Sequence, residues 1–597
     1  MTIPLEHFGM IGDGETAALV SRQGSIDWLC LPRFDSPACC SALLGGSEHG
    51  HWTIAPNDPL LNAEQRYQPD TMILETDLTS AGGSLRLTDF MPIRSQNPVL
   101  IRIVTGLSGR VPTRLTAALR FDYGNMPPWV TRSGDAAVMG VGPDRVVLRG
   151  SDPFEIAGST VTSSFVVTKG SRRAFVLTYC EQDGAEDETV SPHEALANTQ
   201  AYWREWIGRF VRPVEHPEAV RRSLLTLKAL IHRRTGGLIS APTSSLPEQP
   251  GGKMNWDYRY CWLRDASYAL IALVDSGYLH EASAWREWIM RAVAGEPEKM
   301  QIMYRVDGSR RLDEVELPWL PGYRFAKPVR IGNAAAGQMQ LDVYGELIRA
   351  LHASELAGMP RTEQGRHLEA AIVRHVEQVW LKPDRGMWEI RSEPRHYVYS
   401  KVMAWMALHL FLQGKGGGEL DGAERNRIEK VRDHIHEVIC REGFNRGQGS
   451  FTSYFGGREV DASLLLLPKV GFLPIEDERI AGTIALIEKT LIVDGLVQRY
   501  RMDGLDPEGA FVACSFWLAE CQLGQRRRSA ATATLKRALA VRSPLGLLSE
   551  QFDVASRRLS GNFPQALSHL ALVHAVLALA KFDESARWNR RPSAAVV

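Results

Sequence analysis

The hydrophobic pattern of the chain changes its period near Ser191, and this change constrains the fold more than any other feature of the sequence. Before it, runs such as SLRLTDFMPI, NPVLIRIVTGLSG and RRAFVLTYC lie between turns rich in Gly, Pro, Asp and Ser. Many of these runs alternate apolar and polar residues, as short paired strands do. After it, SPHEALANTQAYWREWIGRFV opens with a Ser-Pro helix start and has helical spacing. The sequence therefore predicts a β-sandwich over residues 1–190 and a linker helix over residues 191–215.

From residue 216 to residue 585 helical patterns dominate, and the connections between them alternate in length. The hydrophobic period places about twelve candidate helices here, near residues 216–234, 265–276, 281–294, 333–354, 363–381, 398–413, 422–440, 461–467, 477–489, 510–523, 527–540 and 564–582. Every second connection, starting with the first, is mostly longer and richer in Gly, Pro, Trp and Arg. This predicts a closed ring of helix pairs with its long loops on one face. A helical solenoid is the alternative, but no fixed repeat period supports it. Residues 586–597 are expected to form a disordered tail.

The charges of the chain balance, so no strong net field favours a polyionic partner. Lys and Arg together number 69, as do Asp and Glu together, which argues against nucleic acid or an anionic membrane. The eight cysteines contain no CxxC pair, which favours reduced, buried thiols over disulfides or a metal site. We find no signal-peptide pattern at the N-terminus and no apolar run of about 18 residues that could span a membrane. We therefore expect a soluble, cytoplasmic protein.

Four loop segments concentrate polar and aromatic side chains, and the first is NWDYRYCWLRDASYAL. Its Arg264-Asp265 pair follows a cluster of aromatic residues that includes Trp256. An aspartate at a helix start commonly caps the helix, so a structural role for Asp265 is the alternative. An arginine fork beside a carboxylate supplies both donors and acceptors for vicinal hydroxyl groups. Among aromatic rings, the pair is suited to hold a sugar.

The other three segments contain Trp319, the Trp388-Glu389 pair and Glu550. Each has a plainer interpretation: a helix entry, a surface loop, and a capping box or solvated loop, respectively. Cleavage of a glycosidic bond, however, requires a protonated carboxyl group and a second carboxylate, and about 6.5–9.5 Å between them leads to inversion. An aromatic neighbour such as Trp388 is useful because it can raise the pKa of the proton donor. Two carboxylates on loops of one face therefore make glycoside hydrolysis the working hypothesis.

Seven segments, in this order along the chain, resemble glycoside hydrolase family 15, the family of glucoamylases and trehalases. They are IGDGETAALVSRQGSIDWLCLPRFDSPA, NWDYRYCWLRDASY, PVRIGNAAAGQMQLDVYGE, MWEIRSEPRHYVYSKVMAW, EVDASLLLLPKVGFL, GLVQRYRMDGLDPEGAFVACSFWL and LLSEQFD. The resemblance implies an N-terminal, supersandwich-like β-sandwich followed by an (α/α)6 barrel, a six-hairpin toroid, as the catalytic domain over residues 216–585. It also implies an inverting, single-displacement cleavage of an α-glucoside that releases β-glucose and needs no metal or organic cofactor.

The same resemblance implies roles for individual residues of this chain. Glu389 in MWE matches the family's general acid, and Glu550 in SEQFD matches its general base. Arg264 and Asp265 in WLRD match the pair that holds glucose hydroxyls in the cleaved subsite, and Arg499 in QRY matches a further sugar-binding arginine. The aromatic walls of the site are expected at Trp256, Trp388 and Trp319.

The segments GDGETAALVSRQGSIDWLCLPRFDSP and IGNAAAGQMQLDVYGE are most similar to the bacterial trehalase-like branch of the family. This implies trehalose as the substrate, with maltooligosaccharides and isomaltose-type glucans as the alternative. An inverting phosphorylase is a rival hypothesis, although it would have no use for Glu550. A glycan-binding protein without activity is another. The sandwich domain could also supply a subunit interface for a homo-oligomer.

Overall fold

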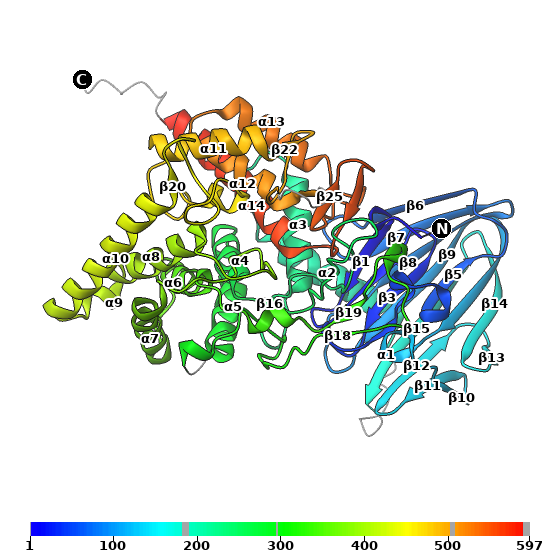
Figure 1. Cartoon of the computed structure of the whole chain (residues 1–597). Coiled ribbons are helices and arrows are strands. Elements are labelled where there is room, and N and C mark those ends of the chain that lie inside the picture. Colours follow the sequence, from blue (N-terminus) through cyan, green and yellow to red (C-terminus); the bar gives the residue numbers. More distant parts are fainter. Residues whose placement is uncertain (1, 182–189, 294–295, 502–507, 589–597) are drawn as a thin grey trace, which may run out of the picture.

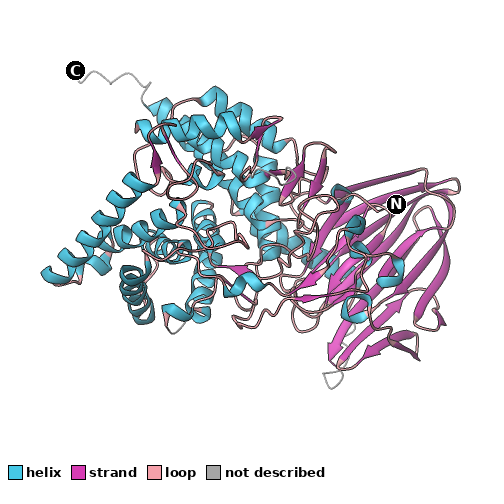
Figure 2. Cartoon of the chain, in the orientation of Figure 1, coloured by secondary structure: helices cyan, strands magenta, loops and turns pink. Residues whose placement is uncertain are grey.

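Two layers of antiparallel strands build the N-terminal part of the chain, and they share one long strand, β9 (Val99–Ala118) (Figure 1, Figure 2). The computed structural model describes residues 2–181, 190–293, 296–501 and 508–588. One layer has the order β1 (Phe8–Gly12), β2 (Ala17–Ser21), β3 (Ser25–Cys30), β5 (His51–Pro56), β9, β14 (Thr160–Thr168), β13 (Glu155–Ala157), with β4 (Ala38–Cys40) beside β3. The other has the order β6 (Asn62–Tyr67), β7 (Leu74–Ser80), β8 (Gly83–Phe90), β9, β15 (Arg172–Glu181), β12 (Asp144–Gly150), β11 (Ala136–Val141), β10 (Trp129–Ser133). The predicted sandwich is confirmed.

Strand β9 passes from one layer to the other because its two halves pair with different neighbours. Its first half pairs with β8 and β15, and its second half pairs with β5 and β14. Gly106 lies near the crossing, where a Cβ atom would come within 2.0 Å of the carbonyl oxygen of Thr168. Only glycine allows this close approach. Trp28 and Trp52 fill the core of this domain and are fully buried.

A helix after the sandwich, α2 (Pro192–Gly208), packs against the second domain. It starts with Pro192, whose missing N–H costs nothing at a first helical position. The indole of Trp206 stacks on Tyr278 at a centroid distance of 4.1 Å and donates a hydrogen bond to Glu281 Oε1 at 2.6 Å. The helix predicted at this position is present, while the exact boundaries at residues 190 and 215 stay predictions.

The second domain is mostly helical (Figure 1, Figure 2), and the contacts between its elements define a ring with an inner and an outer layer. The inner elements contact one another in the order α4 (Arg264–Asp275), α6 (Asp342–Leu356), α8 (Val398–Gln413), η7 (Ala462–Leu466), α12 (Val512–Gly524), α14 (Ala566–Trp588). The ring closes because α14 also contacts α4. Each is preceded by an outer helix: α3 (Pro217–Leu230), α5 (Leu279–Ala292), α7 (Glu363–Val379), α10 (Gly422–Glu442), α11 (Glu478–Thr490) and α13 (Arg528–Leu539). The predicted closed ring, and not a solenoid, is confirmed.

Two inner elements differ from the predicted helices, one in its start and the other in its type. The helix expected from residue 333 begins only at Asp342, because Asn333 starts a short 3-10 turn, η6 (Ala334–Gly337), instead. The inner element η7 is a single 3-10 segment, and Pro468 soon after it cannot continue a helix. The long connections all enter the N-terminal ends of the inner elements, so they gather at one end of the ring.

Helix α14 corrects one expectation from the sequence. Residues Ala566–Ser585 have a mean hydropathy of 1.4 and are long and apolar enough to cross a membrane by length and composition. An apolar run of this kind was not expected. However, 72% of this window is buried inside the protein, where α14 packs against α3, α4 and α12, as a core helix does. The predicted tail begins within α14, which continues to Trp588, and residues 589–597 lie outside the described part of the chain.

Candidate active site

The long loops of the ring surround a cavity of about 340 Å³. Its wall includes five of the residues singled out from the sequence: Trp256, Arg264, Trp388, Glu389 and Arg499. Further lining residues come from the same loops, namely Glu248, Lys253, Tyr258, Arg330, Asn333, Arg391, Tyr500, Glu508 and Phe511. The volume falls in the range of about 300–1,000 Å³ that is typical of small-molecule sites.

Glu389 lies in the cavity wall on a strained turn. Its φ angle is +56°, a conformation that costs a non-glycine residue about 1–2 kcal/mol and needs support from its surroundings. The support includes a hydrogen bond from Gln338 Nε2 to the Glu389 carbonyl at 3.2 Å. The carboxylate itself accepts hydrogen bonds at Oε1 from Trp262 Nε1 at 2.6 Å and from Arg264 Nη1 at 3.3 Å. Burial raises the pKa of Glu389, while the charge of Arg264 and the hydrogen bond from Trp262 partly oppose this.

Arg264 and Asp265 begin the inner helix α4. The guanidinium of Arg264 donates to the carbonyl oxygen of Met387 at 2.6 Å and to Asp265 Oδ1 at 3.2 Å. The other oxygen of Asp265 accepts from the hydroxyl of Ser240 at 3.0 Å. Asp265 is in the first turn of α4 and not at its N-cap, which is Leu263. Arg264 therefore faces the cavity, and the buried Asp265 lies behind it as its ion-pair partner.

Glu550 has no exposed surface and does not line the cavity. Its Oε1 accepts a hydrogen bond of 2.6 Å from the hydroxyl of Tyr258, and its Oε2 accepts one of 3.3 Å from the backbone N–H of Asn562. A Cβ atom at Gly561 would lie 2.4 Å from Oε2, so glycine is required beside this carboxylate. Burial raises the pKa of Glu550, and the charge of Arg499 and the hydrogen bond from Tyr258 act in the opposite direction.

One short segment connects the two carboxylates. Tyr258 contacts Glu550, Trp262 contacts Glu389, and the rings of Tyr258 and Trp262 lie 5.2 Å apart between centroids. Neither residue was assigned a role from the sequence, although both lie in the segment NWDYRYCWLRD that was singled out. The tyrosine lines the cavity between the two acids.

Arg499 lies among three glutamates. It donates to Glu508 Oε2 at 2.8 Å and also to Glu248, and its charge acts on Glu550. Glu248 and Glu508 also line the cavity, although neither was predicted. Glu248 lies in no recognised motif, and Glu508 lies in the segment GLVQRYRMDGLDPEGAFVACSFWL without a role implied for it. Burial raises the pKa of Glu248, and Arg499 opposes this while the neighbouring Glu550 adds to it. One arginine thus pairs with two carboxylates of the cavity wall, and its charge also acts on the buried Glu550.

The three expected aromatic walls have different surroundings. Trp388 donates from Nε1 to Asp461 Oδ1 at 3.0 Å and lines the cavity. Trp256 also lines it, with the guanidinium of Arg391 only 3.8 Å from its ring centroid. Trp319 is 37% exposed and donates to the carbonyl oxygen of Tyr123 in the sandwich domain at 3.1 Å. The structure therefore does not bring Trp319 into the cavity.

Carboxyl groups and hydrogen-bond donors supply the chemistry of this cavity. A carboxyl group with a raised pKa can donate a proton, and a nearby carboxylate can accept one from water. In the described ranges, no group of three or more His, Cys, Asp and Glu side chains is placed to hold a metal ion. Such a pair of carboxyl groups can support acid–base catalysis of a hydrolysis.

Comparison with known proteins identifies the family. Residues 215–577 match the family model for glycosyl hydrolases family 15. The chain belongs to this family and is a glycoside hydrolase. Residues 1–203 match the model of a trehalase-like N-terminal domain. Curated relatives of this family 15 chain include a trehalase of Thermoplasma acidophilum, 36% identical over 566 residues, which cover 93% of this chain and 97% of the relative. A trehalase of Mycobacterium tuberculosis is 34% identical over 626 residues, 98% of this chain and 90% of the relative.

Similarity to a solved structure confirms the fold of this family 15 protein. A bacterial glucoamylase in complex with acarbose superimposes with a TM-score of 0.72 and covers 97% of this chain and 94% of its own. Its sequence identity is only 12%. At that identity the likeness concerns the architecture alone, which is a β-sandwich followed by an (α/α)6 barrel.

Proposed function

We propose that this family 15 hydrolase is a trehalase that splits trehalose into two glucose molecules. The main support is the similarity to trehalases over both domains, at 34–36% identity and more than 90% of each chain. A cavity of about 340 Å³ suits a small substrate. A glucoamylase-type activity on maltooligosaccharides or isomaltose-type glucans is the alternative, and the substrate is an α-glucoside in both cases.

In the proposed mechanism Glu389 is the general acid and Glu550 the general base. Glu389 donates its proton to the glycosidic oxygen while the bond between that oxygen and C1 breaks. Glu550 takes a proton from the water whose oxygen forms the new bond to C1 from the opposite side. The products are β-glucose from the cleaved ring and glucose from the leaving group. Burial supports the first role, because it raises the pKa of Glu389 and favours its protonated form.

Three residues of the cavity wall bind the sugar in this proposal: Arg264, Arg499 and Trp388. Arg264 and Arg499 present donors toward hydroxyl groups, and Asp265 keeps Arg264 in place through its 3.2 Å contact. Trp388 supplies an aromatic face, which its hydrogen bond to Asp461 orients. Trp256 forms part of the cavity wall, but the guanidinium of Arg391 covers one face of its ring.

The stereochemistry and the substrate can be tested together. We expect the protein to hydrolyse trehalose faster than maltose, isomaltose or soluble starch, and to release β-glucose as the new anomer because the displacement is single. Proton NMR in the first minutes of the reaction distinguishes the anomers. A parallel reaction without phosphate is the control, because a phosphorylase would require phosphate and form glucose 1-phosphate. Release of only α-glucose from all substrates would contradict the inverting mechanism. Hydrolysis of maltose but not of trehalose would make the enzyme a glucoamylase.

The pH dependence follows from the two carboxyl groups. Glu550 must be ionised, so kcat/KM is lost as the pH falls through its pKa; Glu389 must be protonated, so kcat/KM is lost as the pH rises through its pKa. Burial raises both pKa values, so both limbs of the profile should lie above the ordinary glutamate value of about 4.3. The variant Trp262→Phe removes a hydrogen bond to ionised Glu389. It should therefore move the alkaline limb to higher pH and leave the acid limb in place. A shift of the acid limb instead would contradict these assignments.

We further propose that the protein functions in the cytoplasm. No disulfide joins any of the eight cysteines, all of which lie in the described ranges, and seven of them are buried. Cysteines without disulfides are typical of proteins in reducing compartments.

A further inference from the structure

We propose that the N-terminal sandwich positions the two carboxyl groups of the active site, and that Arg259 is the positioning residue that transmits this effect. The inference rests on the proposed roles of Glu389 and Glu550. It assigns to the sandwich a part in the reaction itself, beyond its packing against the barrel.

The segment from Asp257 to Trp262 has two sets of contacts. Tyr258 and Trp262 face the cavity side and donate to Glu550 and Glu389, each at 2.6 Å. Asp257 and Arg259 face away from the cavity, toward the sandwich, and neither of them lines the cavity. The backbone of this short segment therefore connects the contacts of Arg259 with the sandwich to the side chains of Tyr258 and Trp262.

Arg259 is inserted into the sandwich domain and is only 1% exposed. Its Nη1 donates to the carbonyl oxygen of Ser36 at 2.7 Å, and its Nη2 donates to the hydroxyl of Tyr123 at 2.8 Å. The guanidinium also lies 5.2 Å from the ring centroid of Tyr123 and 6.0 Å from that of Trp28. A buried arginine with its donors satisfied in a fixed fork is a rigid anchor.

Asp257 completes the anchor on the barrel side. It accepts from Arg259 Nε at 2.9 Å and from Arg259 Nη2 at 2.6 Å. The same carboxylate accepts from the backbone N–H of Gly332 at 3.1 Å and from the hydroxyl of Tyr260 at 3.2 Å. The charge of the buried arginine is thus paired, and the contact to Gly332 links the anchor to the loop that precedes η6.

The strand that pairs with residues 261–262 is followed by two residues that contact residues 33–35 of the sandwich. Trp262 pairs with Met303 where β16 (Cys261–Trp262) meets β17 (Met303–Tyr304). Directly after β17, Arg305 forms an ion pair of 2.8 Å with Asp35, and Asp307 accepts from Arg33 at 2.8 Å.

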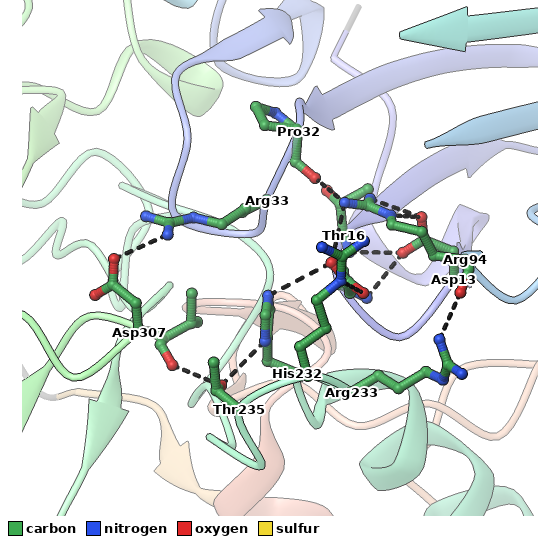
Figure 3. Close-up of polar contacts among 12 residues, drawn as sticks. Asp13, Thr16, Pro32, Arg33, Arg94, His232, Arg233, Thr235 and Asp307 are labelled. Atoms are coloured by element: carbon green, nitrogen blue, oxygen red, sulfur yellow. Dashed lines mark hydrogen bonds and ion pairs between the residues drawn. The ribbon is translucent and has the colours of Figure 1, made fainter. Parts of the chain in front are cut away.

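Figure 3 shows the Arg33–Asp307 contact beside His232 and Thr235, in the cluster where the two domains meet. Residues 33–36 of the sandwich therefore contact residues that flank both strands of the β16–β17 pair, namely Arg259 before β16 and Arg305 and Asp307 after β17. A shift of the strand pair that carries Trp262 would strain these interdomain contacts.

A loss of this anchor should impair catalysis more than binding. A displacement of about 1 Å in a catalytic constellation can cost about 10²-fold in rate, and Tyr258 and Trp262 contact the acid and base themselves. Hydrogen bonds to an ionised carboxylate lower its pKa. If both bonds lengthen, both pKa values should rise, and both limbs of the pH profile should move to higher pH.

The experiment compares Arg259→Lys and the gentler Tyr123→Phe with a matched control, Arg222→Lys. Arg222 is another arginine of the barrel that docks on the sandwich, through a 3.0 Å hydrogen bond to the carbonyl oxygen of Thr71 and a 3.8 Å stack on Tyr67. We expect kcat to fall about 10–100-fold in Arg259→Lys and about 3–10-fold in Tyr123→Phe, with KM changed less than about threefold. In these two variants both limbs of the pH profile should move to higher pH. Arg222→Lys should lower the melting temperature and keep the wild-type kcat and pH limbs.

The inference would be overturned if Arg259→Lys kept the wild-type kcat and pH limbs while folded, as judged by circular dichroism. An equal loss of kcat in Arg222→Lys would also overturn it, because the effect would then belong to domain docking in general. Should Arg259→Lys not fold, Tyr123→Phe decides by the same criteria. Each variant is compared with the wild type on whichever α-glucoside the wild type hydrolyses best. A wrong substrate proposal would therefore show in the wild type, and a wrong positioning proposal only in the variants.

Discussion

Replacement of Glu389 by glutamine is expected to lower kcat for trehalose by about 10²–10⁴-fold, because the amide cannot donate a proton to the leaving oxygen. KM should change little, since the shape of the side chain is kept. The substitution fits the site: the amide oxygen can accept from Trp262 and Arg264, which both donate to the same carboxylate oxygen, Oε1. Steady-state kinetics with a coupled glucose assay measures the effect.

A substrate with a better leaving group provides the control for Glu389→Gln. Fluoride departs without protonation, so the variant should hydrolyse α-glucosyl fluoride at a rate within about tenfold of the wild type. An equal loss on trehalose and on the fluoride would mean that Glu389 does not act as the acid. An unchanged kcat on trehalose would point to the same conclusion.

The architecture was readable from the sequence because each layer imposes a period on its residues. In β7 buried residues alternate with half-buried ones along the whole strand, which is the period of two that predicted a sandwich. The unequal connections predicted the ring, since long loops enter only the inner elements. A helix was expected near residues 564–582, where α14 lies, but its apolar character was not. Ser568, His569 and His574 interrupt the apolar run and hide it in the sequence. His569 and His574 have buried partners in the barrel, the hydroxyl of Ser223 and the carbonyl of Tyr268.

The site was only partly predictable, because motifs mark residues but not their neighbours in space. Arg264 and Glu389 lie 125 positions apart in the sequence. In the structure Arg264 Nη1 lies 3.3 Å from Glu389 Oε1 in the wall of the cavity. Glu248 could not be found from the sequence, because its partner Arg499 lies 251 residues away on another loop. Trp319 was expected in the wall because it is an aromatic residue on a loop. Its actual partner, Tyr123, comes from the other domain, and such a contact leaves no local pattern.

Replacement of Glu550 by glutamine is expected to lower kcat by about 10²–10⁴-fold on trehalose and by a similar factor on α-glucosyl fluoride. Both substrates need an activated water, so the fluoride should not restore activity, in contrast to Glu389→Gln. The glutamine fits, because its amide oxygen can accept from the N–H of Asn562 while the rotatable hydroxyl of Tyr258 accepts from the NH₂ group.

The decisive comparison for the general base is among the glutamates around Arg499. Glu248 and Glu508 line the cavity, whereas Glu550 is buried beside Tyr258. If Glu550 is the base, Glu248→Gln and Glu508→Gln should alter mainly KM and stability, because they pair with Arg499. Azide should reactivate Glu550→Ala by attacking C1 in the space of the lost carboxylate, and the product should be β-glucosyl azide. Formation of this azide by the Glu508→Ala variant, and not by Glu550→Ala, would transfer the role of the base to Glu508.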